Sequence, residues 1–158
     1  WDNIENLYNK GILQKGDRKT IADNFYGIRF RNNKADYIVE ARDKFFNGGC
    51  SLKKIIDSNK DPIVLREYIV SNVRGMGWKE ASHFLRNIGR GEKFAILDRH
   101  ILKGLYMCAI IKSIPGTLTK ARYMDIENSM RDFADNIGIP LAHLDLVFWY
   151  CFNKEIFK

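Results

Sequence analysis

The chain has 158 residues and a mass of 18.4 kDa, which suits a single domain. Hydrophobic residues make up 46% and charged residues 28% of the sequence, as in ordinary globular proteins, so wholesale disorder is excluded. An excess of 26 lysines and arginines over 19 aspartates and glutamates gives a net charge of +7, which favours a polyanionic partner such as nucleic acid.

The sequence contains no signal for a membrane, an exported product or a metal cluster. The longest apolar run, from Leu105 to Ile111, is far shorter than the roughly 18 residues of a membrane span, and no secretory signal pattern opens the chain. We therefore expect a cytoplasmic protein with no membrane partner. Cys50, Cys108 and Cys151 are too few and too widely spaced for an iron–sulfur cluster or a paired zinc site, and predict reduced thiols.

Apolar residues recur at helical spacing along most of the chain, and no stretch keeps the alternation of a strand. This pattern predicts an all-α fold of six helices joined by short breaks. The apolar stripes lie at residues 37–45, 65–73, 81–88, 101–109, 123–137 and 144–151. Asp61 followed by Pro62 predicts the start of the second helix, Thr119 opens the fifth, and Gly138 with Pro140 ends it.

A glycine-rich break precedes the third predicted helix, which opens at Trp78. Its sequence is Val-Arg-Gly-Met-Gly, and Gly75 and Gly77 let the chain reverse sharply and approach another molecule closely. Backbone N–H groups at the start of the following helix favour a phosphate there. A plain turn between two helices has the same pattern, so the glycines alone leave both interpretations open.

Lys79 lies in the first turn of this third helix, where the helix dipole disfavours a cation. Partial burial against Trp78 would add to that effect, and a lysine poised to be neutral is a nucleophile that forms Schiff bases. Asp98 ends a later apolar run, at the start of the fourth helix. A solvent-exposed or phosphate-binding lysine and a helix-capping aspartate would explain the same residues.

Two segments carry a resemblance to a known family. GMGWKEASHFLRN at residues 75–87 and ILDRHIL at residues 96–102 together resemble the archaeal-type 8-oxoguanine DNA glycosylase/AP lyases of the helix-hairpin-helix DNA glycosylase superfamily. The likeness runs from about Gly16 to the end of the chain and is strong from Tyr68 onward. Other superfamily members have a proline before the aspartate, which this narrower family lacks.

The resemblance also implies the extent of the domain. Members of this family have further helices upstream, so residues 1–158 are expected to be the greater part of one helical glycosylase domain, with its hairpin at about residues 62–88. The chain begins at Trp1 rather than at methionine, which fits a trimmed or incomplete product.

The resemblance implies a helical bundle with a cleft for a flipped base, and a bifunctional repair enzyme. Lys79 would attack C1′ of a flipped 8-oxoguanine nucleotide to form a Schiff base, and β-elimination would nick the strand 3′ to the abasic site. Asp98 would stabilise the positive charge that develops on the sugar. No cofactor is implied, and the partner is duplex DNA with 8-oxoguanine or abasic sites, bound by a monomer that associates with the nucleoid.

Several further residues are implied in contacts with DNA. Backbone N–H groups of the two hairpin glycines would bind phosphate, and Phe30 in the basic turn at residues 28–34 would act as a wedge in the distorted duplex. A packed histidine at 100 and a solvated basic turn are the competing interpretations. The DNA-contacting set is Gly75, Gly77, His100, Arg29, Phe30, Arg31 and Lys34, and a structural cation would bind the carbonyls of Ser71, Val73 and Met76.

Four residues are implied in the base pocket. His83 lies one helical turn beyond Lys79 and would border the same cavity. Trp149 would stack on the flipped base, and Asp145, one turn earlier, would accept hydrogen bonds from its edge. Family members commonly end in lysine, so Lys158 would reach the oxidised base. Aromatic residues at helical spacing are more often part of the core, so only the resemblance supports Trp149 and Asp145.

Two other functions explain part of the sequence. A non-catalytic helix-hairpin-helix module that binds the DNA backbone accounts for the glycines and the positive charge, but gives Lys79 and Asp98 no role. A basic helical scaffold or protein-interaction domain accounts for the composition alone.

Overall fold

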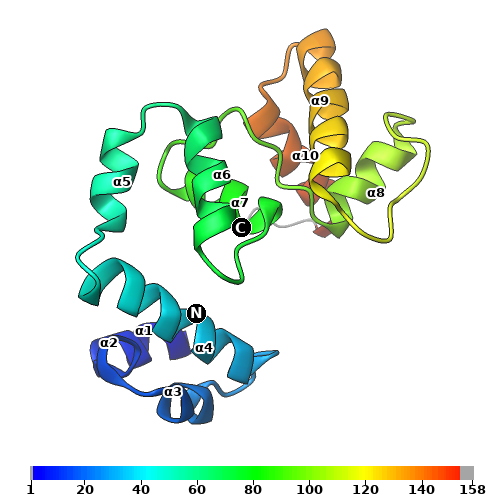
Figure 1. The fold of residues 1–158 in the computed structure, drawn as a ribbon. Coiled ribbons are helices and arrows are strands. Elements are labelled where there is room, and N and C mark those ends of the chain that lie inside the picture. Colours follow the sequence, from blue (N-terminus) through cyan, green and yellow to red (C-terminus); the bar gives the residue numbers. More distant parts are fainter. Residues whose placement is uncertain (1, 154–158) are drawn as a thin grey trace. The chain divides into compact units, whose positions relative to one another are not determined.

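The structure is a computed structural model that describes residues 2–153. All regular secondary structure in these residues is helical (Figure 1), which confirms the predicted all-α class. The chain forms two compact units, the first ending at Gly75 and the second beginning at Met76. This boundary lies inside the glycine-rich break, and a single glycosylase domain over residues 1–158 stays a prediction.

The described residues of the first unit form six α-helices and one short π-helix. They are α1 (Asp2–Asn9), α2 (Ile12–Lys15), α3 (Arg18–Asn24), α4 (Arg31–Arg42), the π-helix (Asp43–Asn47), α5 (Leu52–Ser58) and α6 (Pro62–Asn72). Figure 1 shows α1 to α4 gathered together, and their core contains Leu7, Ile21, Ala22, Phe25 and Ala35. The predicted stripe at residues 37–45 runs from α4 into the π-helix.

The apolar pattern did not reveal α1, α2, α3 or α5. Each has eight residues or fewer, which is too short to establish a helical period. Two of them instead begin at side-chain caps: the carboxylate of Asp17 accepts from the Thr20 N–H at 2.7 Å, and the hydroxyl of Ser51 accepts from the Lys54 N–H at 3.4 Å. The hydrogen bond from the Thr20 N–H lowers the pKa of Asp17.

The second unit contains the helices expected to carry the site. They are α7 (Trp78–Asn87), α8 (Arg99–Met107), α9 (Lys120–Ile137) and α10 (Leu141–Asn153). α10 packs against both α8 and α9. Gly104 of α8 lies so close to Phe148 of α10 that an added Cβ would stand 2.7 Å from the phenyl ring, so this helix contact requires a glycine.

The structure has helix ends at three positions where the sequence predicts them. The carboxylate of Asp61 accepts from the Ile63 N–H at 2.8 Å, and the hydroxyl of Thr119 accepts from the Arg122 N–H at 3.4 Å. Gly138 ends α9 with a left-handed φ of +69°. These three signals are confirmed, whereas the stripes at 65–73, 81–88 and 101–109 extend one or two residues past the ends of α6, α7 and α8. The residues beyond the ends of α7 and α8, Ile88 and Ala109, are exposed, so the apolar period alone does not mark where a helix stops.

A membrane-spanning helix was not expected from the sequence. Within the described part of the chain, no helix combines the length and the apolar character that crossing a bilayer would need.

Candidate active site

α6 and α7 are the helices on either side of the glycine-rich break. Gly77 is the N-cap of α7 and offers no side chain to accept from the first N–H groups of that helix, which leaves these groups to another acceptor. Gly75 has a φ of +85°, and an added Cβ would collide with the ring of Tyr37. Position 75 therefore requires glycine both for its backbone conformation and for its space.

Lys79 lies in the first turn of α7, as predicted. Its side chain is 38% exposed, and its Nζ lies 3.3 Å from Oε1 of Glu80, whose side chain is 48% exposed. An ion pair between two such exposed side chains contributes little free energy, so the amine can exchange this partner for another at small cost.

Asp98 is the N-cap of α8. Its Oδ1 accepts from the N–H groups of His100 at 2.8 Å and of Ile101 at 3.0 Å. Its own N–H donates to the carbonyl of Ile96 at 2.8 Å, at the end of a buried non-helical segment. The capping function is therefore real, and it fixes the carboxylate at the start of α8.

A single cavity of about 550 Å³ is lined by both Lys79 and Asp98. This volume is of the size that holds a small organic group. His100 also lines it, together with a loop at residues 114–118 that the sequence did not indicate. The complete lining is Lys79, Leu97, Asp98, Arg99, His100, Leu102, Ile114, Pro115, Gly116 and Leu118. The amine of Lys79 and the capping carboxylate of Asp98 thus border one space, as the expected chemistry would require.

Three of the four predicted base-pocket residues lie in the described part of the chain but do not border this cavity. His83, Asp145 and Trp149 are absent from the lining of this cavity. Asp145 is fully buried, and both its carboxylate oxygens lie 2.6 Å from Nη1 of Arg86. Trp149 is half-buried and packs against the core of the second unit. Their roles toward a base stay predictions, and Lys158 lies outside the described residues.

Replacing Arg86 by alanine is expected to lower the free energy of unfolding by about 3–5 kcal/mol, because a buried carboxylate loses the cation that compensates it. Urea unfolding measures this change. Arg122→Ala, at an exposed position of α9, is the matched control and should change stability by less than about 0.5 kcal/mol. A loss below about 1 kcal/mol for Arg86→Ala would contradict the dependence of Asp145 on this guanidinium.

The basic turn lies in the first unit. Arg29, Phe30, Arg31 and Lys34 are all exposed, and the guanidinium of Arg29 lies 5.4 Å from the centre of the Phe30 ring. Phe30 has a φ of +56° and is 69% exposed. A bulky residue rarely adopts this backbone conformation, so the local structure displays an aromatic ring at some energetic cost. The wedge role stays a prediction.

The remaining predicted residues are an expected phosphate contact and the carbonyl groups of an expected cation site. Nε2 of His100 accepts from Nε of Arg99 at 3.2 Å. Ser71 and Val73 lie at the end of α6, where carbonyl oxygens lack helical partners, and such oxygens suit a hard cation. Among the described residues, no group of three histidine, cysteine or acidic side chains could hold a metal ion, and Cys50, Cys108 and Cys151 are free thiols. The carbonyl site, which also includes Met76, stays a prediction.

Sequence reasoning missed two buried polar residues near this site. Tyr123 and Glu127 are 1% and 2% exposed, and both bond to the backbone that leads into Asp98. A signal for Glu127 was present, because it occupies an apolar stripe of α9 between Tyr123 and Met130. A charged residue at a core position indicates a specific buried partner.

The all-helical fold, the glycine-rich break and the lysine–aspartate cavity define the helix-hairpin-helix class of DNA glycosylase. A family model described as 8-oxoguanine DNA glycosylase matches residues 1–139. The chain belongs to the 8-oxoguanine DNA glycosylase family.

Individual relatives agree with this assignment. The 8-oxoguanine DNA glycosylase/AP lyase of Fusobacterium nucleatum subsp. nucleatum is 42% identical over 160 residues, an alignment that covers 100% of this chain and 73% of that protein. The protein of the same name from Methanocaldococcus jannaschii is 44% identical over 132 residues, covering 84% of this chain and only 61% of the relative. This chain is thus shorter than either relative.

A solved structure matches over nearly the whole chain. It is the Methanocaldococcus jannaschii 8-oxoguanine glycosylase/lyase in complex with a 15mer DNA containing 8-oxoguanine. The TM-score is 0.84 at 35% sequence identity, and the match covers 99% of this chain and 75% of that one. The fold of this chain is therefore that of the helix-hairpin-helix 8-oxoguanine glycosylases.

Proposed function

We propose that this chain is a bifunctional DNA repair enzyme that excises 8-oxoguanine from duplex DNA and then nicks the strand 3′ to the abasic site. The observation that carries this proposal is the cavity bordered by both Lys79 and Asp98. A base inside a duplex is out of reach of both side chains, so the damaged nucleotide must flip out of the stack before it reacts.

Lys79 is the proposed nucleophile. Its neutral amine attacks C1′ of the flipped nucleotide, the bond from C1′ to the base breaks, and the base leaves with the bonding electron pair and takes up a proton. The sugar ring then opens to give an imine between Nζ and C1′. Loss of a proton from C2′ and cleavage of the bond from C3′ to its oxygen complete β-elimination, which cuts the strand on the 3′ side.

Asp98 is the proposed electrostatic partner of this reaction. The bond to the base weakens before the amine has fully bonded, so positive charge develops on the sugar. A carboxylate that is already oriented by two backbone N–H groups stabilises that charge without having to reorganise. No cofactor takes part in any of these steps.

The proposed partner is duplex DNA that contains 8-oxoguanine or an abasic site, bound by a monomer. Phosphates would meet the first N–H groups of α7, and the exposed basic turn with Phe30 would meet the distorted duplex. His83, Asp145 and Trp149 remain proposed contacts of the flipped base. We place this activity in the cytoplasm, on the nucleoid.

Borohydride trapping tests the proposal. The protein is mixed with duplexes that carry 8-oxoguanine, unmodified guanine or an abasic site, and sodium borohydride reduces any imine to a stable adduct. Adducts with the first and third duplexes support the glycosylase/lyase. Salt-sensitive binding without any adduct would support a non-catalytic DNA-binding module instead. If neither an adduct nor DNA binding is observed, the result would support a helical scaffold without a DNA function.

Replacing Lys158 by alanine is expected to slow excision of 8-oxoguanine, because the resemblance implies that its side chain reaches the oxidised base in the pocket. Single-turnover excision rates of Lys158→Ala and of the wild-type protein measure the effect. Equal rates for the two proteins would remove Lys158 from the proposed pocket.

A further inference from the structure

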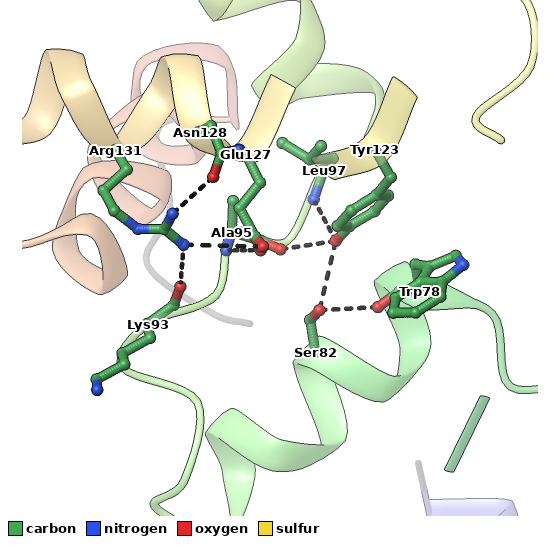
Figure 2. A network of polar contacts seen from close by, with 9 residues as sticks. All are labelled: Trp78, Ser82, Lys93, Ala95, Leu97, Tyr123, Glu127, Asn128 and Arg131. Carbon is green, nitrogen blue, oxygen red and sulfur yellow. Dashed lines mark hydrogen bonds and ion pairs between the residues drawn. The ribbon is translucent and has the colours of Figure 1, made fainter. Parts of the chain in front are cut away.

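The segment that leads into Asp98 is held by side chains of one helix (Figure 2). Residues 94–97 are each at most 2% exposed, and buried backbone groups need hydrogen-bond partners. Tyr123 of α9 donates from its hydroxyl to the carbonyl of Ala95 at 2.7 Å and accepts from the N–H of Leu97 at 3.4 Å. Oε1 of Glu127 accepts from the N–H of Ala95 at 2.9 Å.

Side chains further along α9 bind backbone groups at earlier positions of this segment. Arg131 donates from Nη2 to the carbonyl of Lys93 at 2.9 Å, and the same nitrogen lies 3.8 Å from Oε2 of Glu127. Tyr123, Glu127 and Arg131 are spaced four residues apart and so share one face of α9. A step of four residues along an α-helix advances by about 6 Å, close to the reach of two residues of extended chain. The spacing of these three side chains on α9 therefore matches the spacing of the backbone groups that they bind in residues 93–97.

The same tyrosine also contacts α7, the helix that carries Lys79. Oγ of Ser82 donates to the carbonyl of Trp78 at 2.8 Å and lies 3.5 Å from the hydroxyl oxygen of Tyr123. A phenol has one proton, which its shorter contact with Ala95 uses, so the contact with Ser82 is the weaker one. One hydroxyl group nevertheless touches both elements that carry the proposed catalytic pair.

We propose that Tyr123 and Glu127 are positioning residues for the reaction of Lys79 and Asp98. They fix the buried segment against α9, and the segment fixes where the carboxylate stands at the start of α8. A buried carboxylate costs free energy unless it is hydrogen-bonded, and Glu127 directs one oxygen to the backbone of this segment. Neither side chain lines the cavity, so both act through Asp98. This inference rests on the proposed function.

The test compares single-turnover excision of 8-oxoguanine with the affinity for a duplex that carries a tetrahydrofuran abasic-site analogue. Tyr123→Phe and Glu127→Ala are expected to slow excision by about 10²-fold with little change in affinity, because the pair is displaced while the DNA-binding surface is kept. Glu127→Gln should keep most of the rate, since its amide oxygen still accepts from Ala95. Tyr106→Phe and Asp132→Ala, at exposed positions, are the matched controls.

Rates are expressed per folded molecule, with the folded fraction measured by circular dichroism at the assay temperature, so reduced stability alone leaves them unchanged. Wild-type rates for Tyr123→Phe, or equal losses for Glu127→Gln and Glu127→Ala, would overturn the inference. If Tyr123→Phe does not fold, the difference in excision rate between Glu127→Gln and Glu127→Ala tests the inference by itself. Absence of excision by the wild-type protein would instead refute the proposed function, which separates the two failures.

Discussion

Replacing Lys79 by glutamine is expected to abolish the borohydride-trapped adduct with 8-oxoguanine DNA and to slow strand nicking by at least about 10⁴-fold, because the amide of glutamine cannot form an imine. Glutamine retains a similar length and polarity. The substitution removes only an exposed ion pair with Glu80, so the protein should stay folded and continue to bind duplex DNA. Gel analysis of trapped complexes and nicked strands measures both effects.

The matched control is Lys53→Gln, which removes an exposed lysine from α5 in the first unit. It loses an exposed ion pair of the same kind, with Asp57, and should give a normal adduct. An adduct that persists in Lys79→Gln would show that another amine of the chain attacks the sugar, and the assignment of Lys79 would be wrong.

Asp98→Asn is expected to slow excision by about 10²–10³-fold, the usual effect of removing one preorganised electrostatic group from an active site. Asparagine keeps an oxygen that can accept from the N–H groups of His100 and Ile101, so α8 keeps its cap and stability should change little. Asp98→Ala loses the cap as well and should cost about 1 kcal/mol of unfolding free energy in addition. Single-turnover kinetics and thermal unfolding separate the two contributions.

Asp61 provides the control for this experiment, because it caps α6 in the same way but lies in the other unit. Asp61→Asn and Asp61→Ala should reproduce the stability changes and leave the excision rate per folded molecule unaltered. If Asp98→Asn excises 8-oxoguanine at the wild-type rate, the carboxylate serves only as a helix cap.

Much of the second unit could be predicted from local sequence signals. Asp98, Thr119 and Gly138 mark helix ends through interactions with residues two to four positions away, and such signals are complete within one stretch of sequence. The short helices of the first unit were missed because none of them is long enough to show an apolar period. The core that joins α1 to α3 brings together residues distant in the sequence, such as Leu7 and Ile21, which no local pattern predicts.

In the candidate site, Lys79 and Asp98 could be predicted from the sequence, whereas the residues that surround and support them could not. Lys79 and Asp98 stand out because each carries a charge at a helix start beside a distinctive sequence pattern. The loop at residues 114–118 and the hydrogen bonds of Tyr123 depend on contacts between distant segments, which no local pattern encodes. Asp145 illustrates the limit: the resemblance assigned it to a base pocket, and its buried contact with Arg86 became evident only in three dimensions.

The regular spacing of Tyr123, Glu127 and Arg131 makes the length of α9 as important as its composition. A single substitution there removes only the hydrogen bonds that one side chain makes with the segment before Asp98. Insertion or deletion of one residue after Tyr123 would rotate the rest of the helix by about 100°, since an α-helix has 3.6 residues per turn. Such a change would turn both Glu127 and Arg131 away from residues 93–97, so neither side chain could keep its hydrogen bond to that segment. Variation in length at this point is thus far more harmful than variation in residue type.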